Sequence, residues 1–261
     1  MTGFDADTAL EPAGEGRWRG VVPPTWSIGT GPNGGFMAAL AARAAQSAAG
    51  APPRSLTLHY LAPPAEAEID VIAEVVRAGR SATFLRLTLA QENTPVVLAL
   101  AVCGAWYDDA PGWSDVRPPE LAAREQCVRV DPTRTGVPPL QSRYQLHLAP
   151  GDAGERPARV AGYIRTAEPH PADHPVLAAM ADAFIPPAFF RAPEPVVVPT
   201  LELTIHFRGT PPEGEHPWIV GSFVSRAAGG GVTDEDGELW SEDGRLLVQA
   251  RQLALVRRRP S

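Results

Sequence analysis

The sequence predicts an α+β fold of two tandem repeats, each a long apolar helix wrapped by an antiparallel sheet. Three observations support this. The pentapeptide LTLHY at 56–60 recurs as LTIHF at 203–207, and each copy runs on into a double proline. A small-residue apolar stretch typical of a helix precedes each copy, FMAALAARAA from 36 and VLAAMADAF from 176. A polar turn cluster and an apolar strand follow each copy. A period this long is not that of a solenoid, and it indicates a tandem duplication.

The first half is expected to contain one helix followed by strands. The helix should start just after Asn33, a good N-cap residue. Alternation of apolar and polar residues and a high β-branched content favour strands after it. Gly79 supplies a turn between two of these strands. The expected strands are 56–60, 68–78, 81–92 and 96–102.

The second half is expected to repeat this order after a proline-punctuated connector. A hairpin turn is expected at 242–244, where Gly244 can adopt positive φ. The expected strands are 143–149, 159–165, 200–208, 217–227 and 237–258, the last folded back at that hairpin. The chain therefore divides into an N-terminal unit at 1–107, a connector at 108–140 and a C-terminal unit at 141–261.

The composition argues against several functions. The net charge of −7 argues against general nucleic-acid binding, and all 23 basic residues are Arg. No apolar run approaches the roughly 18–20 residues of a membrane span. The acidic N-terminal stretch does not read as a signal peptide, so a cytoplasmic protein is expected. Cys103 and Cys127 lack metal-ligand spacing, and prolines break any helix that would align His170 with His174. Neither a metal nor a cofactor is expected.

The two copies differ at three positions that are polar in the second half and apolar in the first. Asp182 aligns with Ala42, Thr200 with Pro53 and Gln252 with Val102. The segments around them are GPNGGFMAALAARA, PRSLTLHYLAPP, VVRAGRSATFLRLTLAQ, MADAFIPPAFF, VPTLELTIHFR and DGELWSEDGRLLVQARQLAL. Over nearly the whole chain these segments resemble the acyl-CoA thioesterase II type of the thioesterase-like superfamily.

The resemblance implies a double hotdog fold and hydrolysis of acyl-CoA, a reaction of fatty acid metabolism. Enzymes of that family hold the hydrolytic water with an Asp, a Thr and a Gln, which match Asp182, Thr200 and Gln252 in order. The expected partner is the acyl-CoA substrate, and a homo-oligomer is a further expectation. One catalytic set, carried by the C-terminal unit, is expected.

Each of these three residues also has a physical reading of its own. A carboxylate within an apolar helix should have a raised pKa, which makes Asp182 a better base, unless it lies on an exposed stripe or near the helix end. Gln252 shares its strand face with apolar residues, so its amide should be buried, either beside a water or bonded to a backbone carbonyl. Thr200 shares a face with Glu202 on simple alternation, but it follows a proline, so its direction is open and a plain strand-start Thr fits equally.

The segment GPNGGF at 31–36 is a second candidate site element. Gly34 and Gly35 would occupy the first helical positions after Asn33, where glycine costs up to about 1 kcal/mol relative to Ala. A helix N-terminus with bare N–H groups suits an acyl carbonyl or a phosphate, so these three residues are predicted to bind substrate or an oxyanion. Tight packing of the helix against the sheet explains the glycines equally well.

Two other functions remain open on the sequence. An (R)-specific enoyl-CoA hydratase or dehydratase has a D-x-N-P-[LIV]-H pattern, and ADHPVLAAM starts like it, but the required His is missing, since Ala178 follows Leu177. A non-catalytic acyl-CoA-binding module is the other alternative, because a fold does not fix a function. Direct attack by water is expected for the thioesterase, since no Ser or Cys lies in a nucleophile motif such as G-x-S-x-G.

Overall fold

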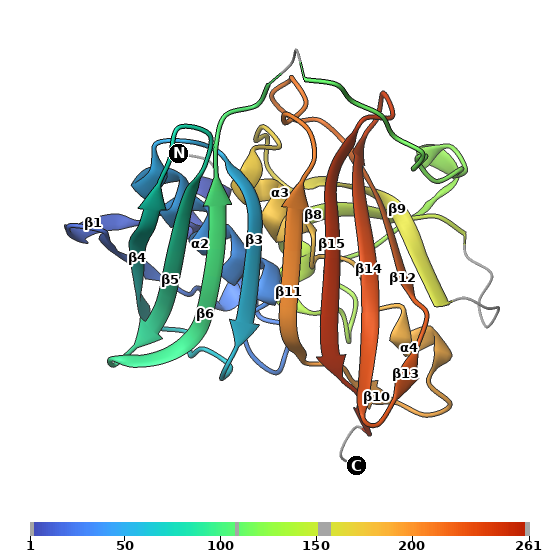
Figure 1. The fold of residues 1–261 in the computed structure, drawn as a ribbon. Coiled ribbons are helices and arrows are strands. Elements are labelled where there is room, and N and C mark those ends of the chain that lie inside the picture. Colours follow the sequence, from blue (N-terminus) through green and yellow to red (C-terminus); the bar gives the residue numbers. More distant parts are fainter. Residues whose placement is uncertain (1–2, 108–109, 151–157, 259–261) are drawn as a thin grey trace.

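Two helices lie on one face of a long, curved antiparallel sheet (Figure 1). The computed structural model describes residues 3–107, 110–150 and 158–258. Within them the sheet has 14 strands in the order β1-β2-β4-β5-β6-β3-β11-β15-β14-β12-β9-β8-β7, with β13 paired to β14. The helix α2 (Gly34–Ala49) packs against the first-half strands and against α3 (His174–Met180).

Each strand expected from the sequence is present, although β14 begins at Val232 and not at 237. The N-terminal hairpin β1–β2 and the two-residue strands β7, β10 and β13 are additions to them. Their bounds are β1 Glu11–Gly14, β2 Arg17–Val21, β3 Pro53–Tyr60, β4 Glu68–Ala78, β5 Thr83–Gln91, β6 Thr94–Cys103, β7 Val128–Arg129, β8 Tyr144–Leu148, β9 Ala158–Thr166, β11 Thr200–Phe207, β12 Ile219–Ser225, β13 Ala228–Gly229, β14 Val232–Ser241 and β15 Leu246–Leu255. A separate small sheet pairs β10 (Val196–Val197) with β16 (Arg257–Arg258). Short helices are α1 (Gly3–Asp7), α4 (Ala188–Arg191), η1 (Pro24–Trp26), η2 (Arg124–Gln126) and η3 (Pro139–Arg143).

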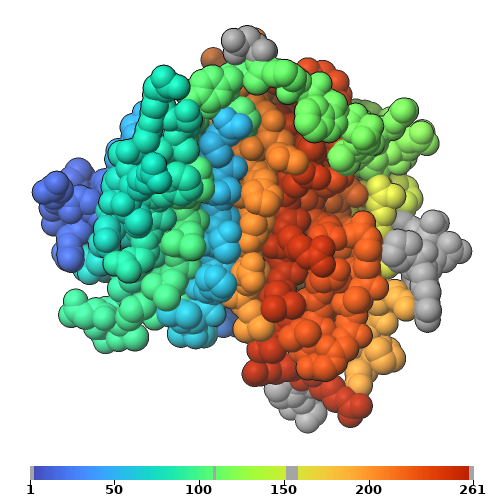
Figure 2. Space-filling view, in the orientation of Figure 1, coloured from blue at the N-terminus to red at the C-terminus, as the bar shows by residue number. Residues whose placement is uncertain are grey.

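The two strands that carry the repeated pentapeptide pair with each other at the centre of the sheet. In the antiparallel β3–β11 ladder Thr57 lies opposite Thr204, and their hydroxyl oxygens are 3.1 Å apart. These two residues are the aligned threonines of the repeat, so the halves meet around a local two-fold relation. The outer face of the sheet is consequently continuous across this seam, with β3 in blue beside β11 in orange (Figure 2).

The ladder register also gives the correspondence between the halves independently of the sequence pattern. Leu203 pairs with Gln252, and the aligned Leu56 pairs with Ala101. Gln252 therefore corresponds to Ala101, and the alignment with Val102 was wrong by one residue. A shift of one residue exchanges the two faces of a strand, so Ala101, which is buried, is the proper comparison.

The helix α2 is buried on almost every side, as the wrapped arrangement predicts. Asn33 caps it, with its side-chain oxygen accepting from the Phe36 N–H at 3.2 Å, and Gly50 ends it with φ of 62°. Most of its central turns have no exposed surface, because Phe36 to Ala42 are enclosed by the sheet and by α3. Burial of this apolar surface fixes the helix on the inner face of the sheet.

The second helix is shorter than expected. The stretch from 176 was predicted to be a long helix containing Asp182, but α3 ends at Met180 and Asp182 lies in the turn that follows. The chain there makes tight bonds, from Asp182 N to Ala179 O and from Ala183 N to Met180 O, both at 3.3 Å. Pro186 and Pro187 come four and five residues after Asp182 and keep the helix from resuming, because proline disfavours a helical residue before it. Asp182 therefore lies outside the helix, in a turn where its side chain meets the N-terminus of α2.

The connector leaves β6 and runs along one end of the sheet before the second half begins (Figure 1). It holds the 3₁₀ helices η2 and η3 and the two-residue strand β7, and is otherwise irregular. In the described part of the chain, no helix is long and apolar enough to cross a membrane.

Candidate active site

Asp182 is held by the N-terminus of the helix from the other half of the chain. Its Oδ2 accepts hydrogen bonds from Asn33 Nδ2 and from the Gly35 N–H, both at 3.0 Å. Asn33 Nδ2 also donates to the Asp182 backbone carbonyl at 2.7 Å. The segment GPNGGF and the acidic residue thus belong to one site, although about 150 residues separate them in the sequence. The helix dipole favours a negative charge at this position.

The two glycines are required by the close approach of this second segment. A Cβ added to Gly35 would lie 2.4 Å from the Ala179 carbonyl oxygen, and one added to Gly34 would lie 2.9 Å from Asp182 Oδ2. The predicted bare N–H groups are not found at Gly35 and Phe36, since protein oxygens already accept from both. Both explanations offered for the glycines, close packing and the binding of an anion, therefore hold, and the bound anion is the carboxylate of Asp182.

Burial raises the pKa of Asp182 to about 6, against the opposing effect of the hydrogen bonds from Gly35, Asn33 and Gly34. The side chain is only partly buried by surface area, so it keeps some access to its surroundings. A carboxyl group with a pKa near 6 is largely ionised at neutral pH and is more basic than an ordinary Asp. The raised pKa was expected, although its site is a turn and not the interior of a helix.

Two tyrosines that the sequence analysis did not single out lie beside this carboxyl group. Tyr60 donates its hydroxyl to the Gly34 carbonyl at 2.8 Å, and burial, followed by the charge of Asp182, raises its pKa. The pKa of Tyr144 is raised by the same two causes, and its buried hydroxyl has no partner among the described residues. A comparison of the two copies of the repeat could have identified Tyr60, because the aligned residue Phe207 lacks a hydroxyl.

Gln252 lies on the inner face of β15, as its alternation with apolar residues predicted. It is 5 % exposed, and it faces Leu203 of β11 on one side and Glu235 of β14 on the other. Its Oε1 is buried and has no hydrogen-bond partner within the described parts of the chain. The small residues Ala250 and Ala254 flank it on the same face of the strand.

Thr200 reaches the same face through a β-bulge. Simple alternation grouped it with Glu202, but the ladder shifts between the two, so that Thr200 lies opposite Ala254 and Glu202 opposite Leu253. Residues directly opposite in an antiparallel ladder share a face, which puts Thr200 on the side of Ala254 and Gln252. The equivalent bulge occurs between Pro53 and Ser55, with Pro53 opposite Cys103. The alignment of Thr200 with Pro53 is thereby supported.

Glu235 is the residue that the sequence analysis missed. It lies directly opposite Gln252 in the β14–β15 ladder and is partly buried. Burial first, and then the charges of Asp182, Asp234 and Asp236, raise its pKa to about 8. The corresponding residue of the first half is Leu85, which lies opposite Ala101 and is 1 % exposed. The sequence could have identified Glu235 by this difference, because a carboxyl group stands where the first half has a core leucine.

Models of two acyl-CoA thioesterase domains match the chain, the N-terminal domain over residues 22–104 and the C-terminal domain over 115–256. The chain belongs to the acyl-CoA thioesterase family. The hydrolase expected from the sequence resemblance is thereby supported at the level of the family, and the family is of the thioesterase II type.

Known proteins similar to this thioesterase family member cover almost its full length. A proposed thioesterase II from Thermobifida fusca is 26 % identical with a TM-score of 0.87, covering 99 % of this chain and 98 % of its own. A protein of unknown function with a hotdog fold from Alicyclobacillus acidocaldarius is 28 % identical with a TM-score of 0.86, at 100 % of both chains. An uncharacterised protein of Mycobacterium tuberculosis is 26 % identical over 92 % of this chain and 90 % of its own. The fold is accordingly an α+β hotdog fold.

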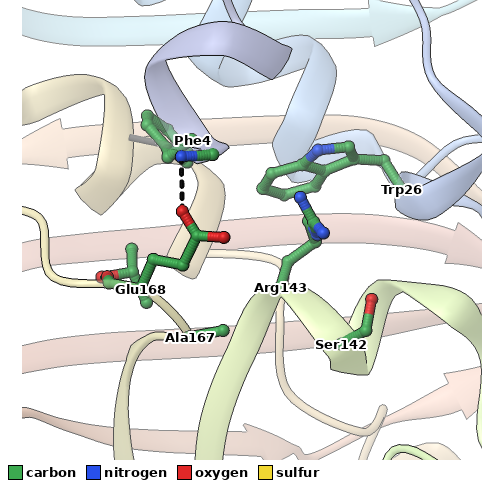
Figure 3. A pocket seen from close by; sticks show the side chains of 8 residues that line it. Phe4, Trp26, Ser142, Arg143, Ala167 and Glu168 are labelled. Atoms are coloured by element: carbon green, nitrogen blue, oxygen red, sulfur yellow. Dashed lines mark hydrogen bonds between the residues drawn. The ribbon is translucent and has the colours of Figure 1, made fainter. Parts of the chain in front are cut away.

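A small hollow elsewhere in the structure contains none of these residues. It measures about 40 Å³ and lies where α1 meets the start of the second half. The Gly3 N–H donates to Glu168 Oε2 at 2.7 Å. Figure 3 shows Glu168, Phe4, Trp26 and Arg143 around this space. A space of this size holds a water molecule and no acyl chain. Its lining contacts anchor the N-terminal helix, and the chemistry is to be sought around Asp182.

Proposed function

We propose that this protein hydrolyses acyl-CoA thioesters to a free acid and CoA, with Asp182 as general base. The proposal depends on one observation, a partly buried carboxylate with a pKa of about 6 that is held by hydrogen bonds at a helix N-terminus. Asp182 takes a proton from water as the water oxygen bonds to the carbonyl carbon. The tetrahedral intermediate then breaks its C–S bond, and the CoA sulfur leaves and is protonated. General base catalysis of this kind typically supplies 10²- to 10⁴-fold.

The roles of the remaining polar residues follow from the groups they offer. Thr200 and Gln252 lie on one inner sheet face, and a hydroxyl and an amide can orient the water or donate to the developing oxyanion. Asn33, Gly34 and Gly35 were predicted to bind substrate, but their donors are engaged with Asp182. We therefore assign these three to holding the base, and oxyanion stabilisation to the strand residues.

Direct attack by water is favoured over an acyl-enzyme. Burial raises the pKa of Cys103 to about 11, and burial with the charge of Glu125 also raises the pKa of Cys127. A thiol with a raised pKa is protonated at neutral pH and is a poor nucleophile. Neither cysteine suits the formation of a covalent intermediate.

We also propose that the chain is a double hotdog with one hydrolytic set. In this view the units span 1–107 and 141–261, joined by the connector at 108–140. The positions equivalent to Asp182, Thr200 and Gln252 are Ala42, Pro53 and Ala101, none of which can bind or deprotonate water. The first unit instead contributes the helix N-terminus that holds the base.

The test is thiol release from a panel of short-, medium- and long-chain acyl-CoAs. We expect turnover of at least one member and a decrease in kcat/KM of at least tenfold in Asp182→Asn. Asp131→Asn, in the connector, is the matched control and should leave turnover unchanged. Unchanged turnover in a folded Asp182→Asn protein would exclude Asp182 as the base. Tight acyl-CoA binding without thiol release would instead favour the non-catalytic binding module, and hydration of crotonyl-CoA would favour the hydratase.

A further inference from the structure

Glu235 occupies an unusual position for a carboxyl group on the inner face of the sheet. In the rung that crosses this part of the sheet, Leu203, Gln252 and Glu235 follow one another on β11, β15 and β14. Its neighbours along the strand, Asp234 and Asp236, belong to the outer face, because successive side chains of a strand alternate between faces. Long side chains directly opposite in an antiparallel ladder are within contact distance. Glu235 and Gln252 are therefore cross-strand neighbours, with their carboxyl and amide groups within reach of one another.

The buried amide of Gln252 needs a hydrogen-bond donor. Its Oε1 is buried and, among the described residues, lacks a partner. Leu203 on one side has no polar group. Thr233, on the next inner rung of β14, has its hydroxyl engaged with the carbonyls of Ala227 and Asp234 and with Ser225. An unsatisfied buried carbonyl is costly, so a donor is expected beside it. Glu235 can supply one when it is protonated.

The charges around Glu235 act on its protonation. The charge of Asp182, in the turn after α3, raises the pKa of Glu235, and no basic side chain of the described chain is bonded to either carboxyl group. The basic residues nearby lie on the outer face, where Arg251 on β15 and Arg226 after β12 pair with Asp236.

In the part of the chain that the structure describes, no cation is among the groups that shift the pKa of Asp182 or Glu235, and the polar groups of neighbouring elements are uncharged. They are the phenols of Tyr60 on β3 and Tyr144 on β8, and the hydroxyl of Ser225 on β12. The pKa of about 8 for Glu235 and of about 6 for Asp182 means that, near pH 7, Glu235 is mostly neutral while Asp182 is mostly ionised. Environments that separate the pKa values of two neighbouring carboxyl groups allow them different roles.

We propose that Glu235 is a positioning residue: as a neutral carboxylic acid it donates a hydrogen bond to Gln252 Oε1 and thereby turns the Gln252 amide N–H groups toward the reacting thioester. This inference rests on the proposed hydrolase function. Glu235 itself does not touch substrate. Its ionisation removes the only proton it can donate, sets a carboxylate against the Gln252 carbonyl oxygen, and releases the amide from its orientation.

The consequence is an alkaline limb in the pH profile. Hydrolysis requires Asp182 ionised and Glu235 neutral, so the rate should rise through about pH 6 and fall through about pH 8. For a group with a pKa of about 8, the neutral fraction decreases about tenfold between pH 7 and pH 9. The rate of the parent protein should decrease by a similar factor once uncatalysed hydrolysis has been subtracted.

The test compares kcat and KM from pH 5 to pH 9.5 for Glu235→Gln, Glu235→Leu and the parent. Glu235→Gln keeps a donor at every pH, so it should lose no more than about threefold in kcat at pH 7 and should lack the alkaline limb. Glu235→Leu introduces the residue found at the equivalent Leu85 and removes the donor. It should reduce kcat about tenfold at pH 7 with little change in KM. Glu238→Gln, on the outer face of the same strand, should reproduce the parent profile.

Several outcomes would overturn the inference. An alkaline limb near pH 8 that persists in folded Glu235→Gln would show that another group titrates there, and parent-like kcat in Glu235→Leu would show that no donor is needed. A loss well above tenfold in folded Glu235→Gln would indicate that Glu235 transfers a proton itself. Failure of the parent to release thiol from any acyl-CoA would instead refute the hydrolase proposal. Thermal unfolding of each variant identifies those that are misfolded.

Discussion

Replacing Asp182 by Asn should make the protein more stable while making it less active. The pKa of Asp182 is raised from 3.8 to about 6, so ionising it in the folded state is unfavourable. A shift of about 2 units corresponds to about 3 kcal/mol. Because the folded pKa lies above the unfolded one, the contribution of Asp182 to the free energy of unfolding is fully present below about pH 4 and is lost as the pH rises through 6. The amide side chain of the variant carries no charge at any pH, so the loss does not occur there.

At pH 7.5 the free energy of unfolding of Asp182→Asn should exceed that of the parent by about 1–3 kcal/mol. The full 3 kcal/mol is not expected, because the new amide N–H₂ group needs a hydrogen-bond acceptor. For a chain of this size that difference is an increase in Tm of about 3–10 °C. Calorimetry at pH 7.5 and pH 4.5 is the assay, and most of the gain should vanish at pH 4.5. Asp131→Asn is the control. Hydrogen bonds from Thr133 lower the pKa of Asp131, so it should show no gain. Equal or lower stability of Asp182→Asn at pH 7.5 would refute the reasoning.

Two further substitutions test the geometry of the site. Gly35→Ala should lower the free energy of unfolding by about 1–3 kcal/mol, because the new methyl group meets the Ala179 carbonyl oxygen. This loss should exceed the gain from the higher helix propensity of alanine. Gly112→Ala, in open space, is the control in the same unfolding assay. Thr200→Val should reduce kcat/KM about tenfold while Thr200→Ser restores most of it, and equal thiol release from both variants would mean that the hydroxyl has no function.

The parts of the fold that could be predicted were those with a clear period. Alternation located the strands and put Gln252 on the inner face, and the capping residue located the start of α2 at Asn33. The burial of α2 followed from its composition. These features depend on residues close together in the chain, where sequence pattern carries the information.

The errors came from places where tertiary geometry overrides the local pattern. The bulge that turns Thr200 inward is a property of the ladder with β15, and alternation alone assigns it to the other face. The shortness of α3 depends on the turn in which Asp182 meets α2, a contact across about 150 residues. Glu235 was overlooked because its significance arises only when the register opposes it to Gln252 and equates it with Leu85.

The hydrogen bonds between the α2 N-terminus and Asp182 make the proposed site depend on both halves of the chain. One half donates the N–H groups and the other carries the acidic side chain, so the proposed site is incomplete in either half alone. A fusion of two like modules can thus keep a module that lacks these polar residues, because that module holds the acidic side chain of its partner.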